Sequence, residues 1–169
     1  EELLRGIEQR AAKLVLLDTL GVMLAGSLQP EVQQIRQRLS TTGGTGATIL
    51  APGWPTSDTR TAALLNGIAG RSIELCEGHR YVSCQAAIQI VPTVLALAEW
   101  GQCSGREALI ALIVGYDVAA RLASGLVARS LAHQNGQAPL LGAVAAGARL
   151  RGLNAAETSR ALRIGATLV

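Results

Sequence analysis

The apolar residues of this chain recur at the period of an α-helix, and this feature limits the possible folds more than any other. In residues 2–26 they lie three or four positions apart, and the same spacing returns in residues 109–126. Because such a period places apolar side chains on one face of a helix, the chain is predicted to be all-α. The second segment could run unbroken to residue 132, about 40 Å at ~1.5 Å per residue. We expect it to be the long central helix of a multi-helix bundle.

The composition favours closely packed helices. Apolar residues make up 49% of the 169 residues, yet only 2% are aromatic and phenylalanine is absent. The core must therefore consist mainly of Ala, Leu, Ile and Val side chains. A chain of this length can bury a substantial core, and we expect a single helical domain over residues 1–169.

Capping and breaking residues predict where the shorter helices begin and end. Pro30 suits the first turn of a second helix that ends before residue 41. Thr56 or Ser57 is expected to cap a third helix that ends near Gly70. The helix that follows the next loop contains Pro92, which should lie in its first turn or at a kink.

Two further helix starts carry the signature of a capping box. They are Ser104 with Glu107, and Asn154 with Glu157. Between the second and third helices, residues 47–50 could form a short strand, which the APGWP segment that follows would break.

The charge pattern argues against nucleic-acid and membrane partners. The net charge is +3, but the 15 basic residues are spread along the chain, whereas a nucleic-acid groove needs a concentrated basic stripe with stacking aromatics. We expect the surplus charge to be solvated arginine, some of which binds anionic small molecules. The long uncharged stretches, residues 81–98 and 130–148, are interrupted by polar side chains and do not predict membrane spans.

The cysteines indicate a reducing compartment. Cys76, Cys84 and Cys103 are odd in number and lack the spacing of a disulfide framework. No basic region with an apolar core and a cleavage site begins the sequence. We therefore expect a cytoplasmic protein.

Residues 65–99 concentrate the reactive side chains between two apolar segments. Eight of them fall within a dozen positions: Glu74, Cys76, Glu77, His79, Arg80, Tyr81, Cys84 and Gln85. A polar segment between two helices is typical of a loop that lines a pocket, because rigid scaffolds display reacting groups on loops. A solvated connector is the alternative interpretation.

Two other chemistries are weaker interpretations of this loop. Cys76 and His79 have the C-x-x-H spacing of half a zinc site, but only Cys84 is near enough in sequence to help complete it. A Cys84 nucleophile activated by His79 has no further support. The thiols are better interpreted as small buried groups, and neither a metal nor a cofactor is expected.

Five segments, taken in order, resemble the MmgE/PrpD family. They are AKLVLLDTLGVMLAG, LLNGIAG, IVPTVLALAE, SGREALIALIVGYDVAARL, and the span from His133 through LGAVAAGARLRGLN. The family includes 2-methylcitrate dehydratase, cis-aconitate decarboxylase and iminodisuccinate epimerase, which act on small polycarboxylates. The resemblance implies a helical domain that dimerises and an active site at the boundary with a second, α+β domain. This chain looks like the N-terminal part of that arrangement.

The resemblance also points to site residues. Where the family has a His followed by an Asp-x-Asp-Asp group, this chain has Arg71, Glu74, Cys76 and Glu77. Gln85 and Ala86 stand where the family has a His-Pro pair, so that catalytic histidine is absent. His133 aligns with the second active-site histidine of the family. The catalytic lysines of the family would lie beyond residue 169.

Chemistry beside a carboxylate needs a positioned acid or base, and cations that hold the developing negative charge. His133 is the candidate acid or base, and Glu74 would orient it or bind a substrate hydroxyl. The substrate-binding candidates are Arg71, Glu77, His79, Arg80 and Gln85. Either of the two arginines can bind a carboxylate through a bidentate pair of hydrogen bonds. In the structural alternative, His133 caps the long helix and the arginines are solvated.

Two hypotheses about function follow. The first is a divergent lyase or isomerase, of the dehydratase or decarboxylase type, that acts on a small carboxylate. The second is a helical module that kept the dimerising scaffold, lost the chemistry, and binds a ligand or a protein. In both cases we expect a homodimer, because a partial helical domain should expose apolar surface. A second subunit could also supply the missing domain.

Overall fold

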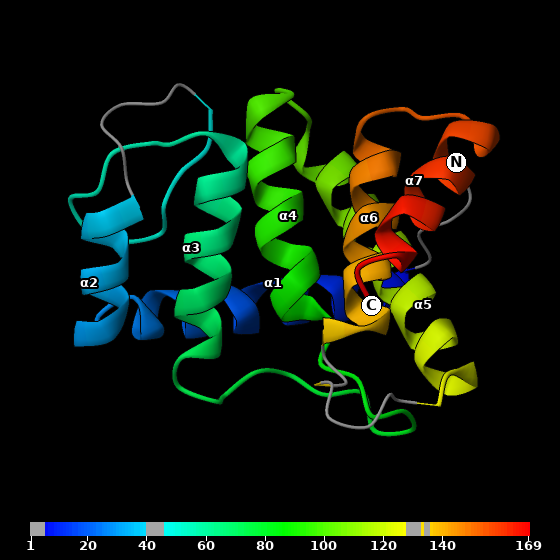
Figure 1. Ribbon diagram of the computed structural model, residues 1–169, viewed down its shortest axis with the longest axis horizontal. Coiled ribbons are helices and arrows are strands. Elements are labelled where there is room, and N and C mark those ends of the chain that lie inside the picture. The colour runs from blue at the N-terminus through cyan, green and yellow to red at the C-terminus, as the bar shows by residue number, and fades with distance from the viewer. Residues whose placement is uncertain (1–5, 40–45, 128–132, 134–135) are drawn as a thin grey trace.

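The computed structural model describes residues 6–39, 46–127, 133 and 136–169 (Figure 1). Seven helices lie within them: α1 (Gly6–Gly26), α2 (Pro30–Leu39), α3 (Thr59–Arg71), α4 (Ala87–Trp100), α5 (Gly105–Gly125), α6 (Ala138–Leu150) and α7 (Ala155–Ala166). The described residues form no strand, only isolated bridges that pair Ala47 with Ser57 and His79 with Cys84. The prediction of an all-α fold is confirmed.

The helices α2, α3, α4 and α6 stand side by side in one layer, and α1 runs across behind them (Figure 1). α4 lies between α3 and α6 and packs against both, and α5 and α7 each pack on α6. α1 contacts α3, α4 and α5. Because it has neighbours on most sides, α4 occupies the middle of the fold.

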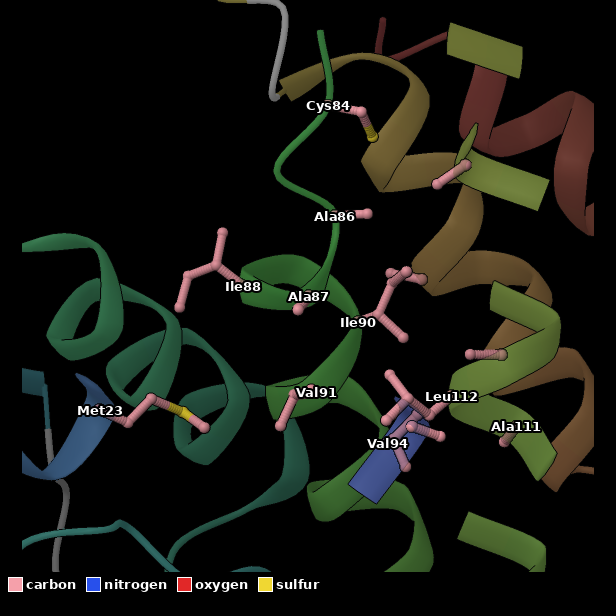
Figure 2. Packing of buried hydrophobic residues seen from close by; sticks show 14 residues of the cluster. Met23, Cys84, Ala86, Ala87, Ile88, Ile90, Val91, Val94, Ala111 and Leu112 are labelled. Atoms are coloured by element: carbon pink, nitrogen blue, oxygen red, sulfur yellow. The ribbon is translucent and has the colours of Figure 1, made fainter. Parts of the chain in front are cut away.

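α4 supplies the largest share of the hydrophobic core (Figure 2). Its buried side chains include Ile88, Ile90 and Val94, which belong to one cluster with Met23 of α1 and Leu112 of α5. Ile88 points toward α3, whereas Ile90 points toward α5 and α6 (Figure 2). The long helix predicted at the centre is α5, but it buries only the face made by Ala111, Leu112, Gly115 and Ala119.

Small residues let α5 and α6 cross closely. A Cβ atom added to Gly115 would lie 2.7 Å from the carbonyl oxygen of Gly142, and one added to Gly142 would lie 2.5 Å from the carbonyl oxygen of Gly115. Ala119 and Ile90 pack into the same crossing. Side chains larger than hydrogen at these two glycines would therefore force the helices apart.

The predicted cap of the third helix is wrong. Asp58, not Thr56 or Ser57, is the N-cap of α3, and its Oδ1 accepts hydrogen bonds from the backbone N–H groups of Arg60 (3.0 Å) and Thr61 (3.2 Å). Ser57 instead pairs with Ala47 through its backbone. A carboxylate is as good an N-cap as a hydroxyl, so residue type alone did not identify which of the neighbouring polar residues caps the helix.

The strand predicted at residues 47–50 does not form. Beyond the Ala47 bridge, the segment bonds to a buried side chain of α3: the Asn66 amide donates to the Thr48 carbonyl at 2.9 Å and accepts from the Leu50 N–H at 2.8 Å. A single amide thus satisfies backbone groups that a neighbouring strand would otherwise pair.

Two other boundaries differ from the prediction. α5 ends at Gly125 instead of residue 132, because Leu126 has extended backbone angles (φ −94°, ψ 132°), and its length is about 32 Å at ~1.5 Å per residue. The rest of that predicted segment, residues 128–132, lies outside the described residues. Pro92 lies inside α4, beyond its first turn.

Both predicted capping boxes are confirmed. The Glu107 N–H donates to Ser104 Oγ at 3.2 Å, and the Ser104 N–H donates to Glu107 Oε2 at 2.7 Å. The Asn154 and Glu157 pair repeats the arrangement at 3.0 and 2.9 Å. These bonds satisfy N–H groups that have no partner inside α5 and α7.

One helix among the described residues, α5, is long and apolar enough to cross a membrane by length and composition, and α1 with α2 passes only if the pair, bent by 88°, counts as one span. The uncharged stretches noted above contribute α4 and α6, which have 14 and 13 residues. These are shorter than the ~20 residues that a spanning helix needs.

Candidate functional site

The polar residues that follow α3 form a loop, as predicted, and this loop leads to the N-terminal end of α4 (Figure 1). Inside it, the His79 N–H donates to the Cys84 carbonyl at 2.9 Å and closes a short turn. At the end of the loop, Ala86 is the N-cap of α4 and has no side chain that could cap the helix. A residue other than Ala86 therefore has to cap the N-terminal end of α4.

Arg71, Glu74 and Gln85 form one polar group, here called the Arg71 cluster. The Nη2 atom of Arg71 lies 2.9 Å from Glu74 Oε2, and its Nη1 atom donates to Gln85 Oε1 at 3.0 Å. Nη1 also lies 3.6 Å from the sulfur of Cys76. Glu74 is exposed and has a φ of 55°, which is uncommon for a residue other than glycine. Three of the predicted site residues are thus in direct contact.

A groove of about 380 Å³ begins beside Arg71. α4 forms its floor, with Gln89 and Pro92, and its walls are α3, with Leu64, and α6, with Leu140. The Oε1 atom of Gln89 is buried and has no hydrogen-bond partner among the described residues. Sequence analysis missed this groove, although the lining positions of α3 and α4 recur at helical spacing.

Glu77 supplies the missing cap of α4. Its Oε1 atom accepts a hydrogen bond from the Ala87 N–H at 2.5 Å, and its Oε2 atom is buried. Burial raises the pKa of Glu77, and the Ala87 N–H and the Tyr116 hydroxyl oppose that rise because they favour the charged form. The carboxylate of Asp18 pushes the pKa in the same direction as burial. A helix-capping contact, which sequence analysis did not foresee, is therefore one role of Glu77.

The raised pKa predicts how stability depends on pH. The folded protein binds a proton at Glu77 more tightly than the unfolded chain does, so the stability this proton adds is present below the ordinary pKa of 4.5 and is lost as the pH rises through the raised value. Glu77→Gln keeps an acceptor for the Ala87 N–H and has no such dependence. In urea titrations between pH 4 and 7.5, we expect the free energy of unfolding of Glu77→Gln, measured relative to that of the wild type, to increase as the pH rises.

Glu77→Ala is the companion variant. It lacks both the acceptor and the titrating group, so its unfolding free energy is expected to lie about 1 kcal/mol below that of Glu77→Gln at every pH, as in other N-cap deletions. If the wild type and Glu77→Gln gave parallel curves of stability against pH, the buried carboxylate would not be the titrating group.

His79 lines a different hollow from Arg71. A cavity of about 320 Å³ lies between α1 and α5, and His79, Glu8, Tyr116 and Asp117 are among the residues that line it. The rings of His79 and Tyr116 have their centroids 6.3 Å apart. The predicted site residues are therefore divided between two hollows, and Tyr116 is a neighbour that sequence analysis assigned only to the core.

The thiols match their interpretation as small buried or partly buried groups. Cys84 is buried, and burial raises its pKa to about 11, with the Glu77 carboxylate acting in the same direction. A thiol with this pKa is protonated at neutral pH, which disfavours the Cys84 nucleophile. Cys76 and Cys103 are also free. In the part of the chain that the structure describes, no group of three His, Cys, Asp or Glu residues could hold a metal ion.

Arg80 and His133 lie apart from the groove lining. Arg80 is exposed and lines neither hollow. His133 is exposed, and its backbone carbonyl accepts a hydrogen bond from the Gly136 N–H at 2.9 Å. Its neighbours on both sides lie outside the described residues, so its catalytic role stays a prediction.

Comparison with known proteins identifies a family. A model of the MmgE/PrpD N-terminal domain matches residues 7–169. The chain is also 28% identical, over 167 residues, to a cis-aconitate decarboxylase-like protein, oryM, of Aspergillus oryzae. That alignment covers 92% of this chain but 35% of the fungal protein, so the chain spans about a third of the length of that relative.

Proposed function

Since the chain belongs to the MmgE/PrpD family, whose N-terminal domain it matches over residues 7–169, we propose that it is the helical part of a lyase or isomerase. The enzyme would be of the dehydratase or decarboxylase type and would act on a small carboxylate. The Aspergillus oryzae relative is a cis-aconitate decarboxylase-like protein, which supports this type of reaction.

The observation that carries the proposal is the Arg71 cluster. The Arg71 side chain is 31% exposed, lines the groove, and has its Nη2 atom 2.9 Å from the Glu74 carboxylate. Its second terminal nitrogen is held by Gln85. An arginine fixed in this way is suited to bind a substrate carboxylate and the charge that develops on it.

Proton transfer is assigned, in this proposal, to His133. Gln85 stands at the position of the family's other histidine, and an amide side chain does not act as a general acid or base near neutral pH, so in this proposal Gln85 holds Arg71. Glu74 is the carboxylate that would orient His133 or accept from a substrate hydroxyl. Because Glu77 caps α4 and His79 faces the cavity between α1 and α5, their proposed substrate-binding roles need a substrate that extends beyond the groove. Arg80 is proposed to attract the substrate electrostatically.

The test is the turnover of His133→Ala. General acid–base catalysis contributes about 10²- to 10⁴-fold, so we expect turnover of cis-aconitate, 2-methylcitrate or a related acid to fall by at least about 100-fold. Because His133 is exposed, the melting temperature should stay within about 1 °C. Arg160→Gln, at an exposed residue of α7 that lines neither hollow, is the control and should keep full turnover. Retained turnover in His133→Ala would contradict the assignment.

The alternative is a helical module that binds a ligand or a protein and does not catalyse a reaction. Two features favour it: Gln85 replaces a family histidine, and Glu77 caps α4. Binding of a carboxylate to the wild type without any product would select this alternative.

We also propose a cytoplasmic homodimer. Four leucines of α1 and the turn after it are exposed, with exposed fractions of 47–67%: Leu14, Leu17, Leu24 and Leu28. A contiguous apolar strip of this kind is usually covered by a partner, either a second copy or a separate subunit. Sedimentation at micromolar concentration would distinguish a dimer from a monomer. The free thiols are compatible with a reducing compartment.

A further inference from the structure

Gln89 lies on the floor of the groove beside Arg71. It is the third residue of α4, and its partly buried side chain lines the groove together with Arg71. The buried Oε1 atom of Gln89 has no hydrogen-bond partner among the described residues. Thr93 also lines the groove, but its hydroxyl donates to the backbone carbonyl of Gln89 at 2.9 Å and not to the side chain. The groove floor therefore contains an acceptor that a bound molecule can satisfy.

A hydroxyl is the group that matches this amide. A buried acceptor without a donor is unfavourable, so a ligand that supplies the donor is favoured over one that does not. The terminal torsion of a glutamine side chain is broad, and its rotation can turn either the oxygen or the nitrogen toward the groove. A hydroxyl can donate to the oxygen or accept from the nitrogen, whereas a carboxylate only accepts and a hydrocarbon does neither.

Arg71 restricts where such a hydroxyl lies relative to a carboxylate. Gln85, which accepts a hydrogen bond from Arg71 Nη1, precedes Gln89 by roughly one helical turn, ~5.4 Å along the axis. This short separation suits an acid whose hydroxyl is one or two carbons away from the carboxylate that Arg71 binds. Leu64, on the groove wall, is 53% exposed, so the other carboxylates of a polycarboxylate can stay hydrated on that side.

We infer that Gln89 is a specificity-determining residue, whose side-chain amide binds a hydroxyl of the acid whose carboxylate Arg71 binds. The inference rests on the proposed function, and it narrows the substrate class to small carboxylates that carry a hydroxyl. Of the two proposed reaction types it favours the dehydratase, whose substrates carry a hydroxyl.

The test compares two pairs of acids that differ only in a hydroxyl: citrate with tricarballylate, and malate with succinate. NMR titration of the purified protein measures the dissociation constants, and the side-chain NH2 signals of Gln89 report on the amide itself. We expect each hydroxy acid to bind about three- to tenfold more tightly than its partner, the effect of one hydrogen bond. Only the hydroxy acids should strongly shift the Gln89 signals.

Gln89→Met removes the amide and keeps an unbranched side chain in the groove floor. The preference for each hydroxy acid should fall below about twofold, while the affinity for tricarballylate and succinate should change by less than about twofold. Its melting temperature should not fall, because the variant no longer buries an unpaired acceptor. Gln34→Met is the matched control, at an exposed residue of α2 that lines neither hollow, and it should keep both preferences.

The outcomes separate this inference from the proposed function. Arg71→Gln should weaken the binding of every acid at least about tenfold, because the carboxylate is the group they share. Equal binding of the paired acids by the wild type, or a preference that persists in Gln89→Met, would overturn the inference and leave the carboxylate site standing. If no acid binds, or if Arg71→Gln binds them as the wild type does, the assignment of the Arg71 cluster as a carboxylate site fails, and the inference fails with it.

Discussion

Gly26→Ala is expected to lower the free energy of unfolding by about 3 kcal/mol, at the upper end of the usual cost of overpacking. Gly26 is the last residue of α1, and a Cβ atom there would overlap the backbone carbonyl of Ala69 in α3. Because the obstacle is main chain, no rotamer change can relieve it. For a chain of this size the loss corresponds to a fall in melting temperature of about 6–12 °C, which calorimetry would measure.

Gly21→Ala is the matched control for that experiment. Gly21 lies in the same helix, but nothing lies within 4 Å of the Cβ atom it would gain. Alanine is a better helix former, so this variant should be more stable than the wild type by about 0.5–1 kcal/mol. Equal losses in the two variants would mean that the crossing of α1 and α3 does not set the cost.

Gly142→Ala is expected to cost about 2 kcal/mol. Its Cβ atom would lie 2.5 Å from the Gly115 carbonyl oxygen and 2.8 Å from the Ala119 Cβ atom, both on α5. α6 would have to move away from α5, and with it Leu140, which lines the groove beside Arg71. Urea unfolding would measure the loss of stability, and carboxylate titration would detect the altered groove.

Gly147→Ala, in the same helix, separates this effect from a general response of α6 to alanine. Its Cβ atom would meet only the end of the flexible Leu97 side chain, at 3.2 Å. We expect a change of less than about 0.5 kcal/mol. A loss as large as that of Gly142→Ala would show that α6 tolerates no substitution, whatever its contacts.

The divided position of the predicted site residues bears on how such a site works. Arg71, Glu74 and Gln85 meet at the groove between α3 and α6, whereas His79 faces the cavity between α1 and α5. Glu77, beside them in sequence, is turned toward the start of α4. Residues of one segment therefore line two different hollows and cap one helix. Their closeness in sequence does not imply that they share a function.

Arg36 illustrates the limit of an argument from composition. The arginines were expected to be solvated, yet the Arg36 side chain is fully buried. Its Nη1 atom donates to the Ser27 carbonyl at 3.2 Å, and its guanidinium lies 5.5 Å from the centre of the Trp54 ring. Burial lowers its pKa. The position of Arg36 in α2 carries no local sign of this, since the enclosing residues come from other segments.

The sequence by itself determined the features that depend on near neighbours along the chain. The helical period, the capping boxes of Ser104 and Asn154, and the polar loop after α3 were predictable because they are fixed within a turn or two of helix. Only the tertiary structure decided which helices cross, and hence that Arg71 reaches Gln85, that Glu77 caps α4, and that a groove runs from Arg71 along α4. These contacts join residues brought together by packing, whose geometry is set by small residues such as Gly26 and Gly142 at the crossings and not by any local pattern.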